Sequence, residues 1–192
     1  KWMNLEKTLK RISSLFSKYK LQDEENLING IKVPPVLELL ELIPESFYSE
    51  NIKTRVHGDF ILDNCIFHDN KFTMIDWRQD FSGELEFGDL YYDLSKLAHN
   101  IVVNHEIIDK DLYTYSNQNE IINVDILCKK SLIECEKILF SWAKKQGFSL
   151  NKIKILRALI WINMSPLHHH PFDSFLFYFG KYNLYKAING KN

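Results

Sequence analysis

Two carboxylates and one amide stand close together in the first half of the sequence. Segment 55–64, "RVHGDFILDN", contains Asp59 and Asn64 five residues apart, and segment 72–77, "FTMIDW", adds Asp76. Carboxylate and amide oxygens are hard donors, which Mg²⁺ prefers together with waters and phosphate oxygens. A carboxylate beside such a site can orient a hydroxyl group and accept its proton. We therefore interpret these residues as a candidate magnesium site with a neighbouring general base.

The residues between them indicate a β-hairpin. Segments 65–67, "CIF", and 72–75, "FTMI", are short apolar runs on either side of "HDNK", whose central Asp-Asn pair tolerates the positive φ of a tight turn. A hairpin returns its second strand beside its first, so Asp76 is expected next to Asn64. The oxygens of Asp59, Asn64 and Asp76 would then converge at one end of the hairpin.

The same motifs resemble the catalytic core of the aminoglycoside phosphotransferase and choline/ethanolamine kinase superfamily, which has a protein-kinase-like fold. One is a loop of the form H-G-D-x-x-x-x-N, which here runs from His57 to Asn64. Another is I-D-W at 75–77, which follows the hairpin. The third is "FGDLYYDLSKL" at 87–97, which looks like the G-D-x-x-x-D-L-[AS] helix of that superfamily.

The resemblance implies a role for each polar residue. Asp59 would be the catalytic base that aligns the acceptor hydroxyl, and Asn64 and Asp76 would hold Mg²⁺ on the nucleotide phosphates. Asp93 would brace the catalytic loop through its backbone amides, and His57 would support that loop rather than react. The implied activity is transfer of the γ-phosphoryl group of ATP or GTP to a hydroxyl of a sugar, an amino sugar or an amino alcohol.

Arg78 follows this motif directly and could contact a phosphate or an anionic substrate. The alternative, which we favour on sequence alone, is an ion pair with Asp80, Glu84 or Glu86. The acids of segment 81–89 could in turn meet a cationic substrate or form a solvated loop.

Helices are expected around this core. Apolar spacing predicts them at 4–20, about 36–43, from Asp89 as N-cap to about 101, about 125–146, about 151–164 and about 172–189. Aromatic residues at helical spacing in 172–185 predict core packing. The predicted fold is α+β and mainly α: a single kinase-like C-terminal lobe over 1–192, with the catalytic core at about 55–97 and a helical remainder at 98–192.

A kinase of this type also needs a phosphate-covering loop and a strand lysine paired with a glutamate. Before Gly58 the sequence contains one glycine, Gly30, and no strand of the V-A-I-K kind. We therefore expect the N-terminal lobe to be absent from a chain that begins at Lys1, and this fragment alone to be inactive. The alternative is a non-catalytic, pseudokinase-like module that binds a nucleotide, a metabolite or a protein partner.

The composition narrows the class of protein. Lys and Arg number 24 against 25 Asp and Glu, which gives a net charge of −1 and no general basic field, so nucleic-acid and membrane partners are disfavoured. No signal peptide or membrane-length apolar segment is visible. The three cysteines, Cys65, Cys128 and Cys135, lack motif spacing, which favours a reducing compartment, with the cytoplasm as the expected location.

Overall fold

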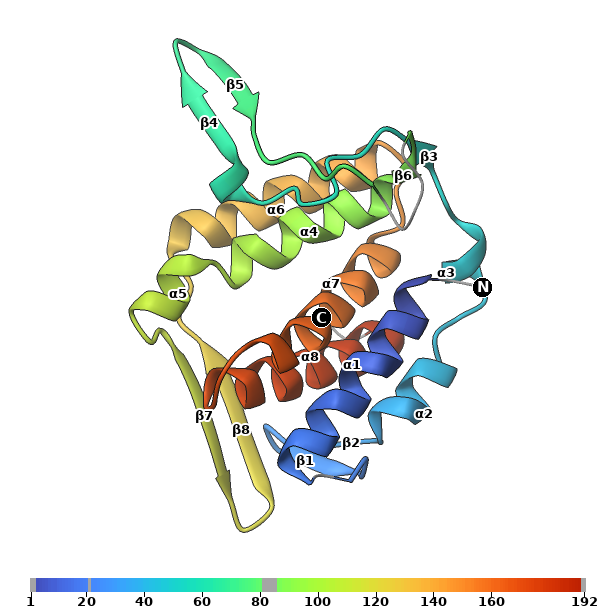
Figure 1. Cartoon of the computed structure of the whole chain (residues 1–192), viewed down its shortest axis with the longest axis vertical. Coiled ribbons are helices and arrows are strands. Elements are labelled where there is room, and N and C mark those ends of the chain that lie inside the picture. The colour runs from blue at the N-terminus through green and yellow to red at the C-terminus, as the bar shows by residue number, and fades with distance from the viewer. Residues whose placement is uncertain (1–2, 21, 81–85, 191–192) are drawn as a thin grey trace.

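The computed structural model describes residues 3–20, 22–80 and 86–190 (Figure 1). The helices are α1 Met3–Tyr19, α2 Val36–Glu41, α3 Ser46–Ser49, α4 Leu90–Val102, α5 His105–Asp109, α6 Lys130–Lys145, α7 Leu150–Met164 and α8 Phe172–Ile188, with 3₁₀ turns at Leu62–Asn64 and Ser165–Leu167. The strands are β1 Asn26–Ile28, β2 Ile31–Val33, β3 Lys53–Thr54, β4 Cys65–His68, β5 Lys71–Met74, β6 Gly88–Asp89, β7 Tyr113–Gln118 and β8 Ile121–Ile126. The fold is therefore α+β and mainly α, as the sequence predicts.

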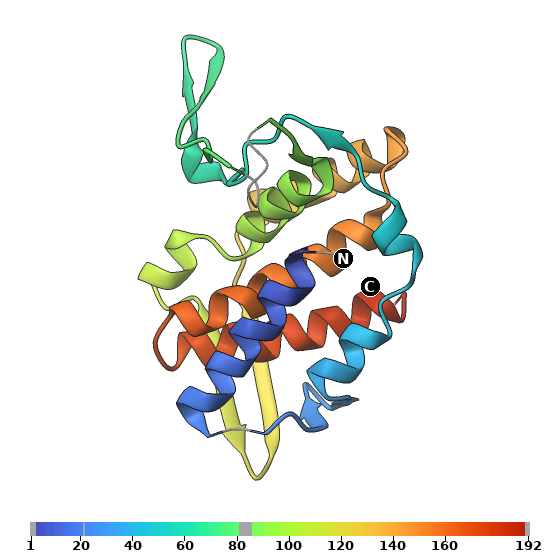
Figure 2. The same cartoon turned by 45° about the vertical axis from the view of Figure 1, so that its right-hand side comes forward.

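Helix α7 lies at the centre of the molecule and packs against α8, α4 and α1 (Figures 1 and 2). Its approach to α8 is close because α8 carries Gly180 at the crossing. A Cβ at this position would lie 2.7 Å from Ile162 Cγ1 and 3.0 Å from the carbonyl oxygen of Ala158. The two helices can keep this separation only because residue 180 has no side chain.

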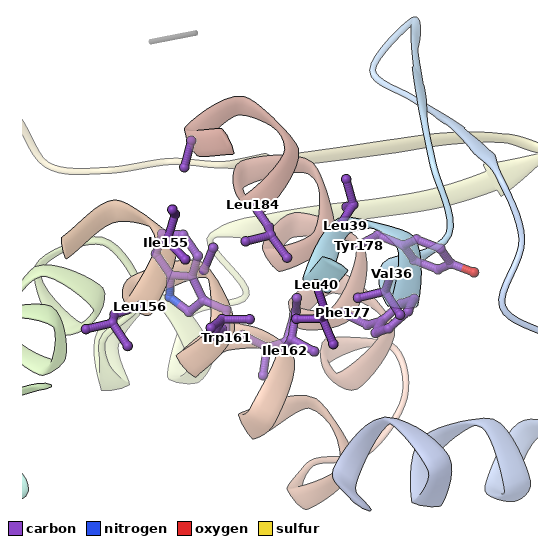
Figure 3. Packing of buried hydrophobic residues seen from close by; sticks show 14 of the residues in the cluster. Val36, Leu39, Leu40, Ile155, Leu156, Trp161, Ile162, Phe177, Tyr178 and Leu184 are labelled. Atoms are coloured by element: carbon purple, nitrogen blue, oxygen red, sulfur yellow. The ribbon is translucent and has the colours of Figure 1, made fainter. Parts of the chain in front are cut away.

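The hydrophobic core forms where α7, α8 and α2 meet (Figure 3). Its buried side chains include Ile155, Leu156, Trp161, Ile162, Phe177, Tyr178, Leu184, Val36, Leu39 and Leu40. The predicted packing role of the aromatic residues in 172–185 is confirmed, since Phe175 and Phe177 are at most 3% exposed. The helices predicted near 4–20, 36–43, 151–164 and 172–189 are confirmed to within a few residues at each end.

The helix predicted from about residue 125 is wrong at its start. Residues 121–126 form β8, which pairs with β7, and α6 begins at Lys130. The sequence "IINVDI" alternates, with Ile122 and Val124 buried and their neighbours exposed, which is the period of a half-buried strand. Sequence reasoning treated this stretch as helical and missed the alternation.

The expectation of a single hairpin is also wrong. Strands β1 and β2 form a second antiparallel pair, and β1 runs parallel to β8, so the sheet order is β2-β1-β8-β7. Strand β3 pairs with β6, which places the chain leading to the candidate site beside the start of α4. Asp89 caps α4 as predicted, because its carboxylate accepts the Tyr91 amide.

Within the described part of the chain, no helix combines the length and the apolar character that crossing a bilayer requires.

A buried lysine connects α8 to the start of the sheet. The side chain of Lys181 is 0% exposed, and its Nζ donates to the Glu24 carbonyl oxygen at 2.7 Å and to Asn26 Oδ1 at 2.6 Å. Burial disfavours the charged form and lowers the pKa of Lys181 from 10.5 to about 8, although the nearby acids partly offset this effect. Folding therefore reduces the affinity of this amine for its proton.

This shift predicts a pH dependence of stability. Between pH 8 and pH 10.5 the unfolded chain retains the lysine proton more than the folded chain does, so the contribution of Lys181 to stability rises with pH through this interval. Relative to Lys181→Met, the wild-type free energy of unfolding should gain about 2 kcal/mol between pH 7 and pH 9.5. Urea unfolding of both proteins at the two pH values measures this gain, and a pH-independent difference between them would contradict the buried, shifted amine.

Candidate active site

One face of α4 holds the segment that the sequence marks as a catalytic loop, residues 57–64, here called the candidate loop. Asp93, Lys96 and Asn100 follow one another at spacings of three and four residues and therefore lie on the same side of the helix. The Asp93 carboxylate is buried and accepts two backbone amides, that of His57 at 2.6 Å and that of Gly58 at 2.9 Å. The start of the loop is thus attached to α4 through both carboxylate oxygens.

Lys96 and Asn100, on the same face of α4 as Asp93, contact the rest of the candidate loop. Lys96 Nζ lies 2.6 Å from Asp59 Oδ1. Asn100 Oδ1 accepts the Leu62 amide at 2.9 Å, and its Nδ2 donates to Asp63 Oδ2 at 3.4 Å. The candidate loop therefore follows α4 over two turns.

Gly58 is the position in the loop that admits no side chain. Its φ of +79° lies in the left-handed region, and a Cβ there would lie 2.7 Å from Arg78 Cβ. The loop and the segment after β5 approach each other so closely because this residue is glycine.

His57 connects the loop to the segment after β5. Its Nε2 lies 2.8 Å from the Ile75 carbonyl oxygen, and its Nδ1 accepts the Asp59 amide at 3.3 Å, an arrangement that assigns the proton to Nε2. The His57 carbonyl oxygen accepts the Arg78 amide at 2.9 Å, and the imidazole lies against the Trp77 ring at 4.8 Å between centroids. Both ring nitrogens are thus engaged with backbone groups.

Asn64 and Asp76 are brought to the same end of the β4–β5 hairpin. The Ile75 amide donates to the Asn64 carbonyl oxygen at 3.0 Å, directly beyond the Cys65↔Met74 pair. Asp76 follows with φ of +58°, a conformation that aspartate tolerates better than most residues. The bonds of Ile75 and Arg78 on either side hold this backbone in place.

The donors at this end of the hairpin suit a hard cation. Asn64 Nδ2 donates to the Asp59 carbonyl oxygen at 2.9 Å, which leaves the side-chain oxygen as the atom that can bind a metal, and the Asp76 carboxylate is exposed. The described residues contain no group of three His, Cys, Asp or Glu side chains that could hold an ion. Mg²⁺ is usually bound through one or two protein oxygens together with waters and phosphates, so the residues present fit it.

Asp59 lies between two cations. Lys96 Nζ contacts Oδ1, and an Arg78 guanidinium nitrogen lies 4.0 Å from Oδ2. Burial by itself would raise the pKa of Asp59, but the hydrogen bond and charge of Lys96, with the charge of Arg78, lower it below its ordinary value. The carboxylate is therefore ionised at neutral pH and able to accept a hydrogen bond.

A cavity of about 140 Å³ opens beside Asp59, between α1, α4 and α7. Its polar lining is Arg11 from α1, Tyr92 and Lys96 from α4, and Arg78, and its apolar wall comes mainly from α7. Of the partners weighed for Arg78 on sequence alone, Glu84 lies outside the described residues. The structure places this guanidinium at Asp59 and at the cavity.

Sequence reasoning missed Lys96, Asn100 and Arg11. A signal for the first two was present, because polar residues at three and seven positions beyond Asp93 continue one face of a helix that is otherwise largely buried. Arg11 gave no such signal, because an arginine on the polar side of an amphipathic helix is ordinarily predicted to face solvent.

Comparison with known proteins supports the motif assignment. The model of the phosphotransferase enzyme family matches residues 21–113, just under half of the chain. Residues 21–113 are thus similar to that family, which confirms the resemblance inferred from the motifs. The match spans the candidate loop, the β4–β5 hairpin and α4. Searches of curated proteins and of solved structures returned no match.

The double attachment of the loop predicts the effect of Asp93→Asn. The amide side chain offers one acceptor oxygen and turns an N–H donor toward the other backbone amide, so one buried bond is lost. We expect the free energy of unfolding to fall by about 1–3 kcal/mol, as measured by chemical denaturation.

Asp69→Asn is the matched control, because Asp69 is an exposed residue of the hairpin turn with φ of +47°, which Asn also accepts. Its free energy of unfolding should stay within about 0.5 kcal/mol of wild type. Equal effects of the two substitutions would show that the Asp93 carboxylate does not brace the loop.

Proposed function

We propose that this protein catalyses Mg²⁺-dependent transfer of the γ-phosphoryl group of ATP or GTP to a hydroxyl of a small molecule such as a sugar, an amino sugar or an amino alcohol. The observation that carries the proposal is the position of Asp59. This ionised carboxylate lies beside a cavity, and the loop that holds it ends at Asn64, whose backbone is bonded to Ile75, the residue before Asp76. The match of residues 21–113 to the model of the phosphotransferase enzyme family supports the reaction class.

In the proposed reaction Asp59 accepts a hydrogen bond from the acceptor hydroxyl and orients its oxygen toward the γ-phosphorus. The new bond forms between that oxygen and phosphorus, and the bond from phosphorus to the β–γ bridging oxygen breaks with its electron pair on the departing nucleoside diphosphate. The hydroxyl proton passes to Asp59. Bound Mg²⁺, held by Asn64 and Asp76, would neutralise charge on the phosphates.

The proposal includes a second lobe that contributes the phosphate loop and the strand lysine of this reaction class. Gly30, the glycine that precedes Gly58, has φ of +74° and forms the β1–β2 turn with Asn29. It therefore serves a hairpin rather than a loop over phosphates. We expect the 192-residue chain alone to bind nucleotide weakly and to show no turnover.

The β4–β5 hairpin supports this part of the proposal. It projects away from the helices (Figures 1 and 2) and, with the residues that follow it, exposes several large apolar side chains: Ile66, Phe67, Phe72, Ile75 and Trp77. A concentration of large exposed apolar side chains on one element is typical of an interaction site. A lobe that packed against this hairpin would hold a nucleotide above Asn64 and Asp76.

One observation favours the rival function, a non-catalytic module that binds a nucleotide, a metabolite or a partner. The 2.6 Å contact with Lys96 occupies one oxygen of Asp59 and lowers its pKa, which weakens it as a proton acceptor. Phosphoryl transfer depends chiefly on positioning and charge neutralisation, however, so a weakly basic aspartate is compatible with catalysis.

The division of roles predicts that two matched substitutions fail differently in the intact protein. Asp59→Asn keeps the size and one oxygen but cannot take a proton, so kcat should fall roughly a hundredfold or more while Mg·ATP affinity is retained. Asp76→Asn removes a charge from the metal ligands, so activity should also shift toward higher Mg²⁺ concentration.

Initial rates and calorimetric titration with Mg·ATP separate these effects. Loss of metal–nucleotide binding in Asp59→Asn, with binding retained in Asp76→Asn, would show that the two roles are assigned wrongly. Full nucleotide binding without phosphorylation of any acceptor by the wild type would favour the non-catalytic module.

A further inference from the structure

Three cationic side chains line the cavity beside Asp59. Arg11 comes from α1, Arg78 from the segment after β5 and Lys96 from α4, so the fold gathers them from distant parts of the sequence. The described residues that line this cavity include no carboxylate. Since the whole chain has a net charge of −1, this positive excess is a local property of the cavity.

Each of these cationic side chains has more N–H donors than the contacts described below use, so N–H groups remain that can bind a ligand. Arg11 donates through one guanidinium nitrogen to the Asn163 carbonyl oxygen at 2.6 Å, and a guanidinium carries five N–H groups. Lys96 contacts Asp59 at 2.6 Å, and an ammonium has three donors. Arg78 lies 4.0 Å from Asp59 and its side chain is 56% exposed. One carboxylate therefore faces two of the three cations.

The surroundings strengthen an interaction with an anion. Burial lowers the pKa of Arg11; nearby Tyr92 acts in the opposite direction, and the positive charge of Arg78 adds to the lowering. Arg11 and Arg78 line the same cavity, so their positive charges repel each other. Tyr92, also in the lining, has a raised pKa mainly because it is buried, so its hydroxyl adds no negative charge to the cavity. A bound anion would relieve the repulsion between the arginines.

We propose that this cavity binds an anionic group, phosphate or carboxylate, of the phosphoryl acceptor and so selects hydroxylated anions over neutral and cationic acceptors. The inference rests on the proposed function, because it names the class of acceptor. Lys96 is the positioning residue, since it contacts Asp59 and lines the cavity, and it sets the anionic group of the acceptor near the carboxylate that orients its hydroxyl. The apolar wall from Leu156, Leu159 and Ile160 contacts the carbon skeleton.

The size of the cavity is adequate for this role. Its volume of about 140 Å³ is far above the roughly 10–15 Å³ that holds one water, so a phosphate or carboxylate group fits with part of the molecule that carries it. Guanidinium groups bind both anions through paired N–H donors.

Glucose and three derivatives that each differ from it at one carbon test the proposal: glucose 6-phosphate, glucuronate and glucosamine. Calorimetric titration of the intact protein measures binding, and nucleotide consumption measures transfer. We expect at least one of the two anionic sugars to bind on the order of tenfold more tightly than glucose, and glucosamine to bind most weakly. Whichever anion binds better identifies the acceptor's anionic group as phosphate or carboxylate.

Arg11→Met should reduce affinity for the favoured anionic sugar on the order of tenfold and leave glucose unchanged. Arg11→Lys keeps the charge and should restore most of the affinity, which separates loss of charge from loss of structure. Lys10→Met removes the same charge from the next residue of α1, an exposed position outside the cavity, and should change nothing.

Equal affinity for all four sugars, or preference for glucosamine, would overturn the inference. So would an Arg11→Met protein that loses Mg·ATP affinity instead, because the cavity would then hold the nucleotide. Arg11-dependent binding of an anionic sugar without transfer to any acceptor would reject the proposed phosphotransferase and retain the anion site, so the two failures are distinguishable.

Discussion

The candidate site depends on the buried carboxylate of Asp93. Two backbone amides from consecutive residues, His57 and Gly58, donate to its two oxygens, and this attachment gives the candidate loop its place on α4. Burial raises the pKa of Asp93, while the two amide bonds act in the opposite direction and stabilise the carboxylate. A charge buried in this way is tolerated because it is hydrogen-bonded on both oxygens, and the same bonds leave the loop little freedom. The attachment fixes the loop immediately before Asp59, and the hairpin that follows brings Asn64 and Asp76 to the same end.

Two buried lysines show the same principle elsewhere in the fold. Lys152 on α7 donates to the Glu50 carbonyl oxygen at 2.6 Å and to Asn51 Oδ1 at 2.8 Å, and Lys181 uses a matching pair of acceptors at the start of β1. Lys152 Nζ also lies 3.6 Å from Asp89, the cap of α4. The central helices α7 and α8 therefore hold the irregular segments through single buried amines. The helix that supports the candidate loop is itself supported from α7.

The sequence predicted several features that depend on near neighbours, although it missed the β1–β2 hairpin and the alternation of β8. The hairpin turn formed at Asp69 and Asn70 with φ of +47° and +57°, because these residues tolerate that conformation wherever they occur. The loop motif and the cap of α4 were also recognisable, because each depends on residues close together in the sequence. The four-stranded sheet was not, because its two inner strands, β1 and β8, pair through Leu27 and Ile121, which lie far apart in the sequence. The cavity was missed for a similar reason. Arg11 lines it only because α4 and α7 pack beside α1, and the sequence of α1 does not predict this packing.

The charges around Asp59 also bear on how a negatively charged acceptor could react at all. Its oxygen must approach a phosphoryl group that is itself anionic, and the two repel each other more strongly inside a protein than in water because the effective dielectric constant is lower. Arg78 and Lys96 lie at Asp59 and line the cavity, so they offset this repulsion at the place where it arises. A neutral acceptor would need less of this compensation. The cations that make Asp59 a weak base are therefore the groups that an anionic acceptor would require.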